Sequence, residues 1–230
     1  MALHVRRIAA SEALPLREIR LAALADAPFA FARTHAEEAS LPYSFWADRA
    51  AGNAEGTAGA TFIAQDDRSW LGLVGGFRPT GETARGTCSA AHLVDTVDLV
   101  SMWVTRDGRC RGVGGLLVDA VLQWASDTGA ARVSLWVTEG NLPAIRLYER
   151  AGFATDGACK PLPSDPCRTE RRMTRPDSSA CSPPVSRTAL PTATTPYSLG
   201  ALRRSSRTLR AAAAAPVSAE SAAAISVRAT

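Results

Sequence analysis

The chain has 230 residues, with 26 Lys and Arg against 22 Asp and Glu, and 46% of its residues are hydrophobic. This length predicts one ordinary domain with an extension, or two small domains, and the longest apolar runs fall far short of the roughly 20 residues that span a bilayer. The start of the chain has Arg6, Arg7 and Glu12 where a signal peptide would have its apolar segment, so we expect a cytoplasmic protein that enters no membrane.

Hydrophobic periodicity predicts alternating strands and helices over the first 176 residues. We expect strands at 4–9, 61–65, 70–77, 93–104, 132–138, 153–158 and 169–174, and helices at 12–25, 43–49, 113–128 and 143–151. Ser11 is the expected cap of the first helix. Gly129 and Gly152 follow the last two helices, where a left-handed residue closes a helix. This order predicts a mixed α/β domain.

The composition changes near Pro176, and we place the boundary of the folded domain there. Residues 1–176 carry equal numbers of basic and acidic side chains, whereas residues 177–230 carry the whole net charge of +4 and are rich in Ser, Ala, Pro and Thr. This segment has no Trp or Phe, so it has too little large apolar surface to offset the entropy of ordering its backbone. We therefore predict a domain at 1–176 and a disordered tail at 177–230. Two alternatives for this tail stay open. Its scattered arginines contact nucleic acid or a membrane surface, or the tail results from a readthrough or frame error in the gene.

The chain contains five cysteines, at positions 88, 110, 159, 167 and 181. Their number is odd, their spacing is wide, and none forms a C-x-x-C pair. This pattern predicts reduced thiols rather than a disulfide framework or a zinc site, and we expect no metal.

A glycine-rich loop at 105–115, TRDGRCRGVGG, precedes the expected helix at 113–128. Its glycines let the backbone approach a ligand closely, and the N–H groups of the first helical turn are unsatisfied donors. Together with Arg109 and Arg111 they predict a site for phosphate or pyrophosphate. A Walker loop would need Gly-Lys-Ser/Thr, and a dinucleotide fingerprint would need glycine where the chain has Leu117, so neither fits. The alternative is a plain connection with two solvated arginines.

Two blocks of this sequence resemble the GCN5-related N-acetyltransferase (GNAT) superfamily. The first is R-x-x-G-x-G, from Arg109 to Gly114, which is similar to the pyrophosphate loop of that family. The second is N-x-x-A-x-x-x-Y-x-x-x-G-F, from Asn141 to Phe153. The order of elements is similar as well: a strand, two helices, a three-strand meander, a helix, a strand, a helix and two closing strands. The resemblance covers about residues 1–176 and implies a mixed central sheet that is splayed between its fourth and fifth strands.

The resemblance implies acetyl-coenzyme A (acetyl-CoA) as the acyl donor and co-substrate. In such a protein the pyrophosphate lies on N–H groups of the loop, and the pantetheine arm pairs with the end of the fourth strand. The residues implied to contact the cofactor are Met102, Trp103, Val104, Arg109, Cys110, Arg111, Gly112, Val113, Gly114, Gly115, Asn141 and Tyr148. Because main-chain groups do the binding, we interpret Cys110 as incidental. Asn141 also has a structural interpretation, as the N-cap of the helix that carries Pro143.

Two catalytic groups are implied by the same resemblance. A primary amine has a pKa of about 10, so a base must first remove a proton. The family often places a glutamate six residues before the end of the fourth strand, and that position is Asp98 here. As the base, Asp98 would reach the amine through a water; the alternative is a carboxylate on the strand face with no catalytic role. Asp95 and Glu139 are the lesser candidates for the base. Tyr148 is implied to protonate the leaving thiolate, and its alternative is a packing aromatic on the helix face of Ile145.

We therefore expect an N-acetyltransferase that transfers an acetyl group from acetyl-CoA to a primary amine of a small molecule, protein or peptide. The alternative function is a non-catalytic module that binds or senses acyl-CoA. No nucleic-acid partner is expected for the domain, and a homodimer stays open. The acceptor-facing segments, the first two helices and the loop at 78–90, hold no motif that identifies the acceptor. Arg17, Arg20, Glu37 and Glu38 are candidates to line the acceptor site, and the alternative, which we favour, is that they are solvated charges on the faces of the first helices.

Overall fold

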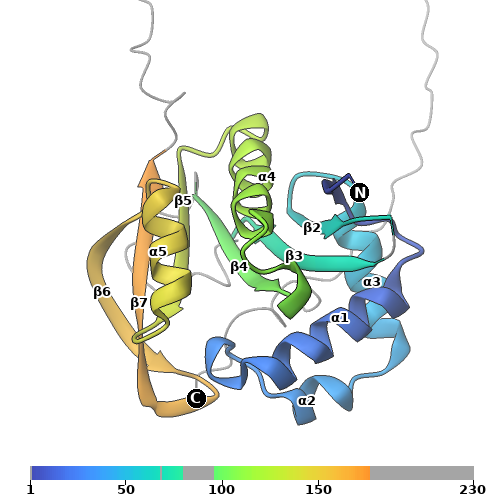
Figure 1. Ribbon diagram of the computed structural model, residues 1–230, viewed down its shortest axis with the longest axis horizontal. Coiled ribbons are helices and arrows are strands. Elements are labelled where there is room, and N and C mark those ends of the chain that lie inside the picture. The colour runs from blue at the N-terminus through green and yellow to red at the C-terminus, as the bar shows by residue number, and fades with distance from the viewer. Residues whose placement is uncertain (1, 68, 80–95, 177–230) are drawn as a thin grey trace, which may run out of the picture.

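The computed structural model describes residues 2–67, 69–79 and 96–176, which form one seven-stranded sheet with helices on both faces (Figure 1). The elements in chain order are β1 (His4–Arg7), α1 (Ala13–Asp26), a 3-10 turn (Pro28–Ala30), α2 (His35–Ala39), α3 (Tyr43–Ala54), β2 (Gly59–Gln65), β3 (Trp70–Phe77), β4 (Thr96–Val104), a second 3-10 turn (Arg106–Gly108), α4 (Val113–Asp127), β5 (Arg132–Thr138), α5 (Leu142–Arg150), β6 (Ala154–Leu162) and β7 (Asp165–Pro176). The expected order of strands is confirmed, and the structure adds one helix, α2.

The strands lie in the order β1-β2-β3-β4-β5-β7-β6. Neighbouring strands are antiparallel except for β4 and β5, which are parallel. A parallel pair needs a crossover connection, and α4 supplies it. The sheet is therefore mixed and open, as the family resemblance implies.

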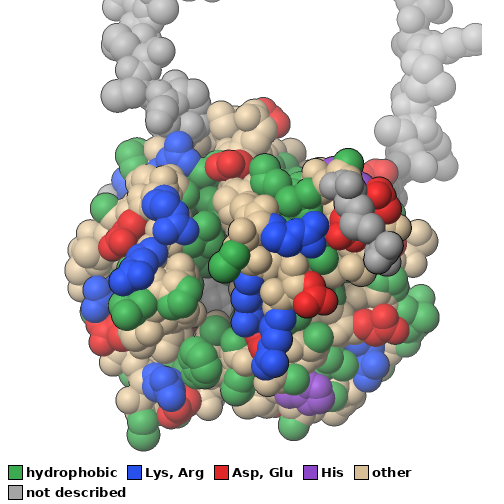
Figure 2. All heavy atoms as spheres, viewed as in Figure 1, with side chains coloured by type: hydrophobic (Ala, Val, Ile, Leu, Met, Phe, Trp, Pro, Cys, Tyr) green, Lys and Arg blue, Asp and Glu red, His purple; other side chains and the backbone are tan. Residues whose placement is uncertain are grey.

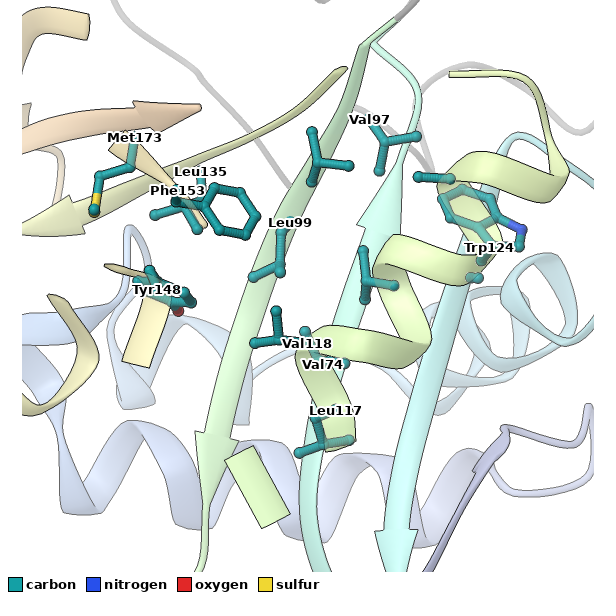
Figure 3. Close-up of a cluster of buried hydrophobic side chains, with 14 of the residues drawn as sticks. Val74, Val97, Leu99, Leu117, Val118, Trp124, Leu135, Tyr148, Phe153 and Met173 are labelled. Atoms are coloured by element: carbon teal, nitrogen blue, oxygen red, sulfur yellow. The ribbon is translucent and has the colours of Figure 1, made fainter. Parts of the chain in front are cut away.

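The main core lies between the sheet and α4 (Figure 3). The apolar stripe of α4 includes Leu117, Val118 and Val121, all fully buried, and it packs on Val97 and Leu99 of β4. A second core lies on the opposite face, where α1 and α3 pack against β2 and β3. Because side chains alternate along a strand, each residue of β4 faces one of these two layers.

The helix ends differ in part from the expectation. Ser11 does not cap α1, so that prediction is wrong: the N-cap is Glu12, whose carboxylate accepts hydrogen bonds from Arg6 and from the N–H of Ala9. Gly129 and Gly152 do adopt left-handed conformations, with φ of 72° and 84°.

The helix that the sequence analysis missed, α2, is only five residues long. It carries a capping box, in which Thr34 Oγ1 accepts from Glu37 N–H and the Glu37 carboxylate accepts from Thr34 N–H at 2.7 Å. Hydrophobic periodicity cannot reveal so short a helix, but the T-x-x-E spacing of a capping box does signal its start.

Several expectations fall outside the described residues. They are the start of the strand expected at 93–104, Asp95, most of the loop at 78–90, Cys88, Cys181 and the tail at 177–230. Within the described ranges, Cys110, Cys159 and Cys167 are free and exposed. No helix in these ranges is long and apolar enough to cross a membrane.

Candidate active site

The parallel strands β4 and β5 part in the middle of the sheet. Their pairing ends at Asp98 and Ser134. Beyond that point β4 stays paired with β3 up to Val104, and β5 stays paired with β7 up to Thr138, so the two facing edges have no strand between them. A bulge at Ser101, whose φ is 56°, bends β4 within this free stretch. Figure 2 shows a hollow in this face of the molecule, between α5 and the segment that follows β4.

The glycine-rich loop connects the free end of β4 to α4. Its first turn is fixed by Thr105, whose N–H donates to the Leu71 carbonyl at 2.9 Å and whose Oγ1 accepts from Gly108 N–H. Gly112 then takes a left-handed conformation, with φ of 79°, and is the N-cap of α4. The first helical bond runs from Leu116 N–H to the Gly112 carbonyl. The N–H groups of the three residues between them therefore lie outside the helical ladder and are donors for a ligand.

The open space around this loop fits a ligand that approaches the backbone. A Cβ added at Gly112 or Gly115 would meet no atom within 4 Å, whereas one at Gly114 would meet Leu147 at 3.1 Å. Gly112 and Gly115 thus border free space, and Gly114 faces α5.

Arg109 and Arg111 of the loop are both held by carboxylates. Arg109 forms an ion pair with Asp26 and donates from Nε to the Val104 carbonyl, and Arg111 lies 3.5 Å from Asp66. Their positive charge is offset within the protein. The capacity of the loop to bind an anion therefore rests on its backbone N–H groups and the start of α4 more than on the two side chains.

Asp26, the last residue of α1, was not singled out from the sequence, yet it connects three groups of the site. Its carboxylate accepts from Trp103 Nε1 and from Arg106 Nε, each at 3.1 Å, and pairs with Arg109. The Trp103 hydrogen bond, followed by those of the two arginines, holds the pKa of Asp26 below its usual range. An aspartate at a helix end gives no sequence signal of such long-range contacts.

Asp98 lies where the two strands part. Val97 and Leu99 belong to the core under α4, so Asp98 faces the opposite layer, the side of α1 and α3. Ser134 donates a hydrogen bond to its carboxylate. Burial raises the pKa of Asp98, against this hydrogen bond and the positive charges of Lys160 and Arg172. A raised pKa makes Asp98 a stronger base than an ordinary aspartate.

Tyr148 approaches the same opening from the other face of the sheet. It belongs to the core cluster on the side of α4 and α5, and only 6% of it is exposed (Figure 3). Its ring packs edge-on against Phe153, with centroids 5.9 Å apart, so the packing interpretation is confirmed. Burial raises the pKa of its hydroxyl, so the phenol is protonated at neutral pH and is a weaker acid than an exposed tyrosine.

Asn141 caps α5. Its side chain accepts a hydrogen bond from Ala144 N–H at 3.4 Å, with Pro143 in the first turn, and this confirms the N-cap interpretation. By contrast, the expectation of solvated charges on the first helices is wrong for Arg20 and Glu38, which are 5% and 2% exposed. The two side chains are paired with each other, and pairing allows opposite charges to be buried together.

A family model described as "Acetyltransferase (GNAT) family" matches residues 20–153. The chain belongs to this family. The match includes both sequence blocks, the parting strands and the loop before α4.

Two curated relatives match shorter stretches. One is the mycothiol acetyltransferase of Corynebacterium aurimucosum, 41% identical over 66 residues, which is 27% of this chain and 22% of that protein. The other is an uncharacterized N-acetyltransferase of Methanocaldococcus jannaschii, 34% identical over 59 residues, or 26% of each protein. The matched stretches thus span about a quarter of these relatives.

Solved structures share the fold along most of the chain. An acetyltransferase of the GNAT family from Streptococcus pneumoniae aligns with a TM-score of 0.60 at 17% identity, over 76% of this chain and 99% of that one. A GCN5-related N-acetyltransferase from Kribbella flavida gives 0.58 at 23% identity, over 76% and 98%. The structure of yncA from Salmonella typhimurium, which holds its cofactor acetyl-CoA, gives 0.57 at 13% identity, over 80% and 99%.

Proposed function

We propose that this chain is an N-acetyltransferase that transfers an acetyl group from acetyl-CoA to a primary amine. The observation that carries the proposal is the parting of β4 and β5 at Asp98 and Ser134, next to a helix start with unpaired N–H groups. Membership in the GNAT family and the acetyl-CoA held by yncA support the choice of cofactor.

The residues present fit that cofactor. The free edge of β4 at Met102, Trp103 and Val104 offers backbone groups to an extended pantetheine chain, as a neighbouring strand would. Backbone N–H groups between Arg109 and Gly115 would hold the pyrophosphate, and the open space at Gly112 and Gly115 leaves room for it. When bound there, acetyl-CoA supplies an acetyl thioester.

Asp98 and Tyr148 would act on the acceptor nitrogen and the sulfur, respectively. Asp98 accepts a proton from the ammonium group through a water, so that the free amine can attack the thioester carbonyl. A carbon–nitrogen bond forms and the carbon–sulfur bond breaks. Tyr148 donates its hydroxyl proton to the departing thiolate, and the second proton, which the acetylated nitrogen must lose, passes through water to the Tyr148 phenolate, so that a neutral amide, a thiol and the original phenol result. The two groups lie on opposite faces of the sheet, so each can serve a different atom of the reaction, Asp98 the acceptor nitrogen and Tyr148 the sulfur.

The test is a turnover assay of the full chain with acetyl-CoA and a broad panel of amines and peptides. The exposed cysteines of the chain would react with a thiol reagent, so acetylated product should be detected by mass spectrometry rather than by thiol release alone. Acetylated product supports the proposal. Saturable binding of acetyl-CoA with no acetylated product across the panel would refute it and support a non-catalytic module that binds or senses acyl-CoA.

A further inference from the structure

A cluster of three charged side chains is buried among α1, α2 and α3. Arg20, Glu38 and Arg49 are 5%, 2% and 8% exposed. Arg20 donates from Nε and Nη2 to the two Glu38 oxygens, at 3.0 and 2.7 Å, so both carboxylate oxygens are engaged in one fork. The nearest Arg49 nitrogen, Nη1, lies 3.9 Å from Glu38, which is an ion-pair contact but not a hydrogen bond.

Two of these three side chains are positive and one is negative, and the nearby charge of Arg33 adds to the positive side. Arg49 Nε and Arg20 Nη1 are buried and have no hydrogen-bond partner among the described residues. Burial, and then the charge of Arg20, lowers the pKa of Arg49 to about 10. A buried N–H group without a hydrogen-bond partner costs folding free energy, and a water, an ion or a ligand that accepts from it removes that cost.

Arg49 also reaches the opening between β4 and β5. Its Nη2 donates to Ser101 Oγ at 3.4 Å, and Ser101 is the half-buried bulge residue on the free stretch of β4. This contact lies on the sheet face of Asp98, opposite Tyr148. In the proposed reaction that face belongs to the acceptor.

We propose that Arg49, backed by Arg20, binds a carboxylate of the acceptor, so that the acceptor is an amine that also carries a carboxylate group. This inference rests on the proposed function, because it assigns the acceptor of the same site. A guanidinium fork matches the geometry of a carboxylate. The two arginines of the cluster outnumber its one carboxylate, and Arg33 adds a further positive charge nearby, so this site favours an acceptor that carries a negative group. Arg49 also lies over the Trp46 ring at 5.9 Å, and its Nε, which has no hydrogen-bond partner among the described residues, is available to a ligand oxygen.

The experiment compares acids with their amides as acceptors. The panel contains 4-aminobutyrate, 5-aminovalerate and 6-aminohexanoate, α-amino acids, and the primary amide of each compound. For the first three the amine lies far from the carboxyl group, so acid and amide differ mainly in the negative charge. We expect the best acid to exceed its amide by roughly 10- to 150-fold in kcat/KM, mostly through KM. The variant Arg49→Met should abolish this preference and leave the Kd of acetyl-CoA unchanged.

Two further variants separate binding from folding. Arg17→Met removes a half-buried arginine of α1, whose contact is the Ala39 carbonyl, and it should keep the preference for acids. Arg49→Lys keeps the charge but loses the fork, and it should retain only part of the preference. Because Arg20 alone forms the hydrogen-bonded fork with Glu38, Arg49→Met leaves that pair intact and removes a second buried guanidinium, so its Tm should equal or exceed that of the parent chain. A large fall in Tm would show that Arg49 serves the fold, and would overturn the inference.

The outcomes also distinguish this inference from the proposed function. Acetylation without a preference for acids would refute the inference alone. If no amine is acetylated, the proposed function fails, and the inference is then tested by the shift in Tm that each ligand causes. With CoA present, 5-aminovalerate should raise the Tm more than its amide does, and Arg49→Met should remove this difference. Equal shifts from acid and amide would overturn the inference.

Discussion

Gly112 and Gly129 lie at opposite ends of α4 and provide a matched test of where the anion binds. Both are left-handed, with φ of 79° and 72°, and a Cβ added at either would meet no atom within 4 Å. An alanine at either position therefore incurs only the cost of the left-handed backbone, about 1–2 kcal/mol. For a domain of this size that corresponds to a fall in Tm of about 2–8 °C. We expect Gly112→Ala and Gly129→Ala to lower the Tm by similar amounts.

Only one of the two variants should weaken acetyl-CoA binding. At Gly112 the new methyl group would occupy the space through which a phosphate approaches the N–H groups, and the loss of one charge-assisted hydrogen bond raises Kd roughly 10- to 150-fold. Gly129, at the far end of the helix, should leave Kd within about twofold of the parent value. Calorimetric titration below the Tm of both variants measures this difference.

Acetyl-pantetheine, which lacks the pyrophosphate, sharpens the comparison. Its affinity should be nearly the same for the parent chain and for Gly112→Ala. Equal losses of acetyl-CoA affinity in the two variants, or an equal loss for both ligands in Gly112→Ala, would refute a pyrophosphate site on this loop.

Three other substitutions test the roles of single side chains. Tyr148→Phe should lower kcat roughly 10²- to 10⁴-fold and leave acetyl-CoA affinity nearly unchanged, and unchanged turnover on a verified acceptor would exclude the acid role. Burial raises the pKa of Asp98 in the folded chain. The protonated side chain therefore stabilises the fold in full below the ordinary aspartate pKa of about 3.9, and this stabilisation is lost as the pH rises through the raised pKa. Asp98→Asn should therefore raise the Tm at pH 7 but not near pH 3.5, and should lower kcat/KM about 100-fold; full activity would remove Asp98 from the mechanism. The pKa of Asp26 is lowered, chiefly by the hydrogen bond from Trp103. The charged carboxylate therefore stabilises the fold in full above the ordinary aspartate pKa, and this stabilisation is lost as the pH falls through the lowered pKa. Asp26→Asn should destabilise the fold by about 1–2 kcal/mol at neutral pH, measured by denaturant titration, and the deficit should shrink in acid.

Long periodic elements were predictable because their pattern records a single buried face. The bounds of β3 and β5 match the expectation, and α4 ends within one residue of it. The strands β6 and β7 extend beyond the predicted ranges because they form an edge hairpin with many exposed positions. Exposed positions carry no alternation of polar and apolar residues, so the pattern ends before the strands do.

The candidate site was predictable where it depends on the backbone and not where it depends on pairing. The loop glycines and the helix start follow from local sequence, and so does the cap at Asn141. The partners of Arg109 and Arg111, by contrast, come from segments far away in the chain. The burial of Arg20 with Glu38 also depends on how three helices pack. A single sequence does not reveal which distant charges meet, and so it gives no sign that Arg109 and Arg111 are paired with carboxylates.

The contacts of Asp26 have a thermodynamic consequence. This residue ends α1 and is hydrogen-bonded to Trp103 of β4 and to the loop before α4, while the same helix carries Arg20. One rigid helix therefore touches both the proposed cofactor loop and the proposed carboxylate site. A ligand that displaces α1 at one of these sites changes the free energy of binding at the other. Because such linkage is reciprocal, acetyl-CoA and the acceptor should alter each other's affinity by the same factor.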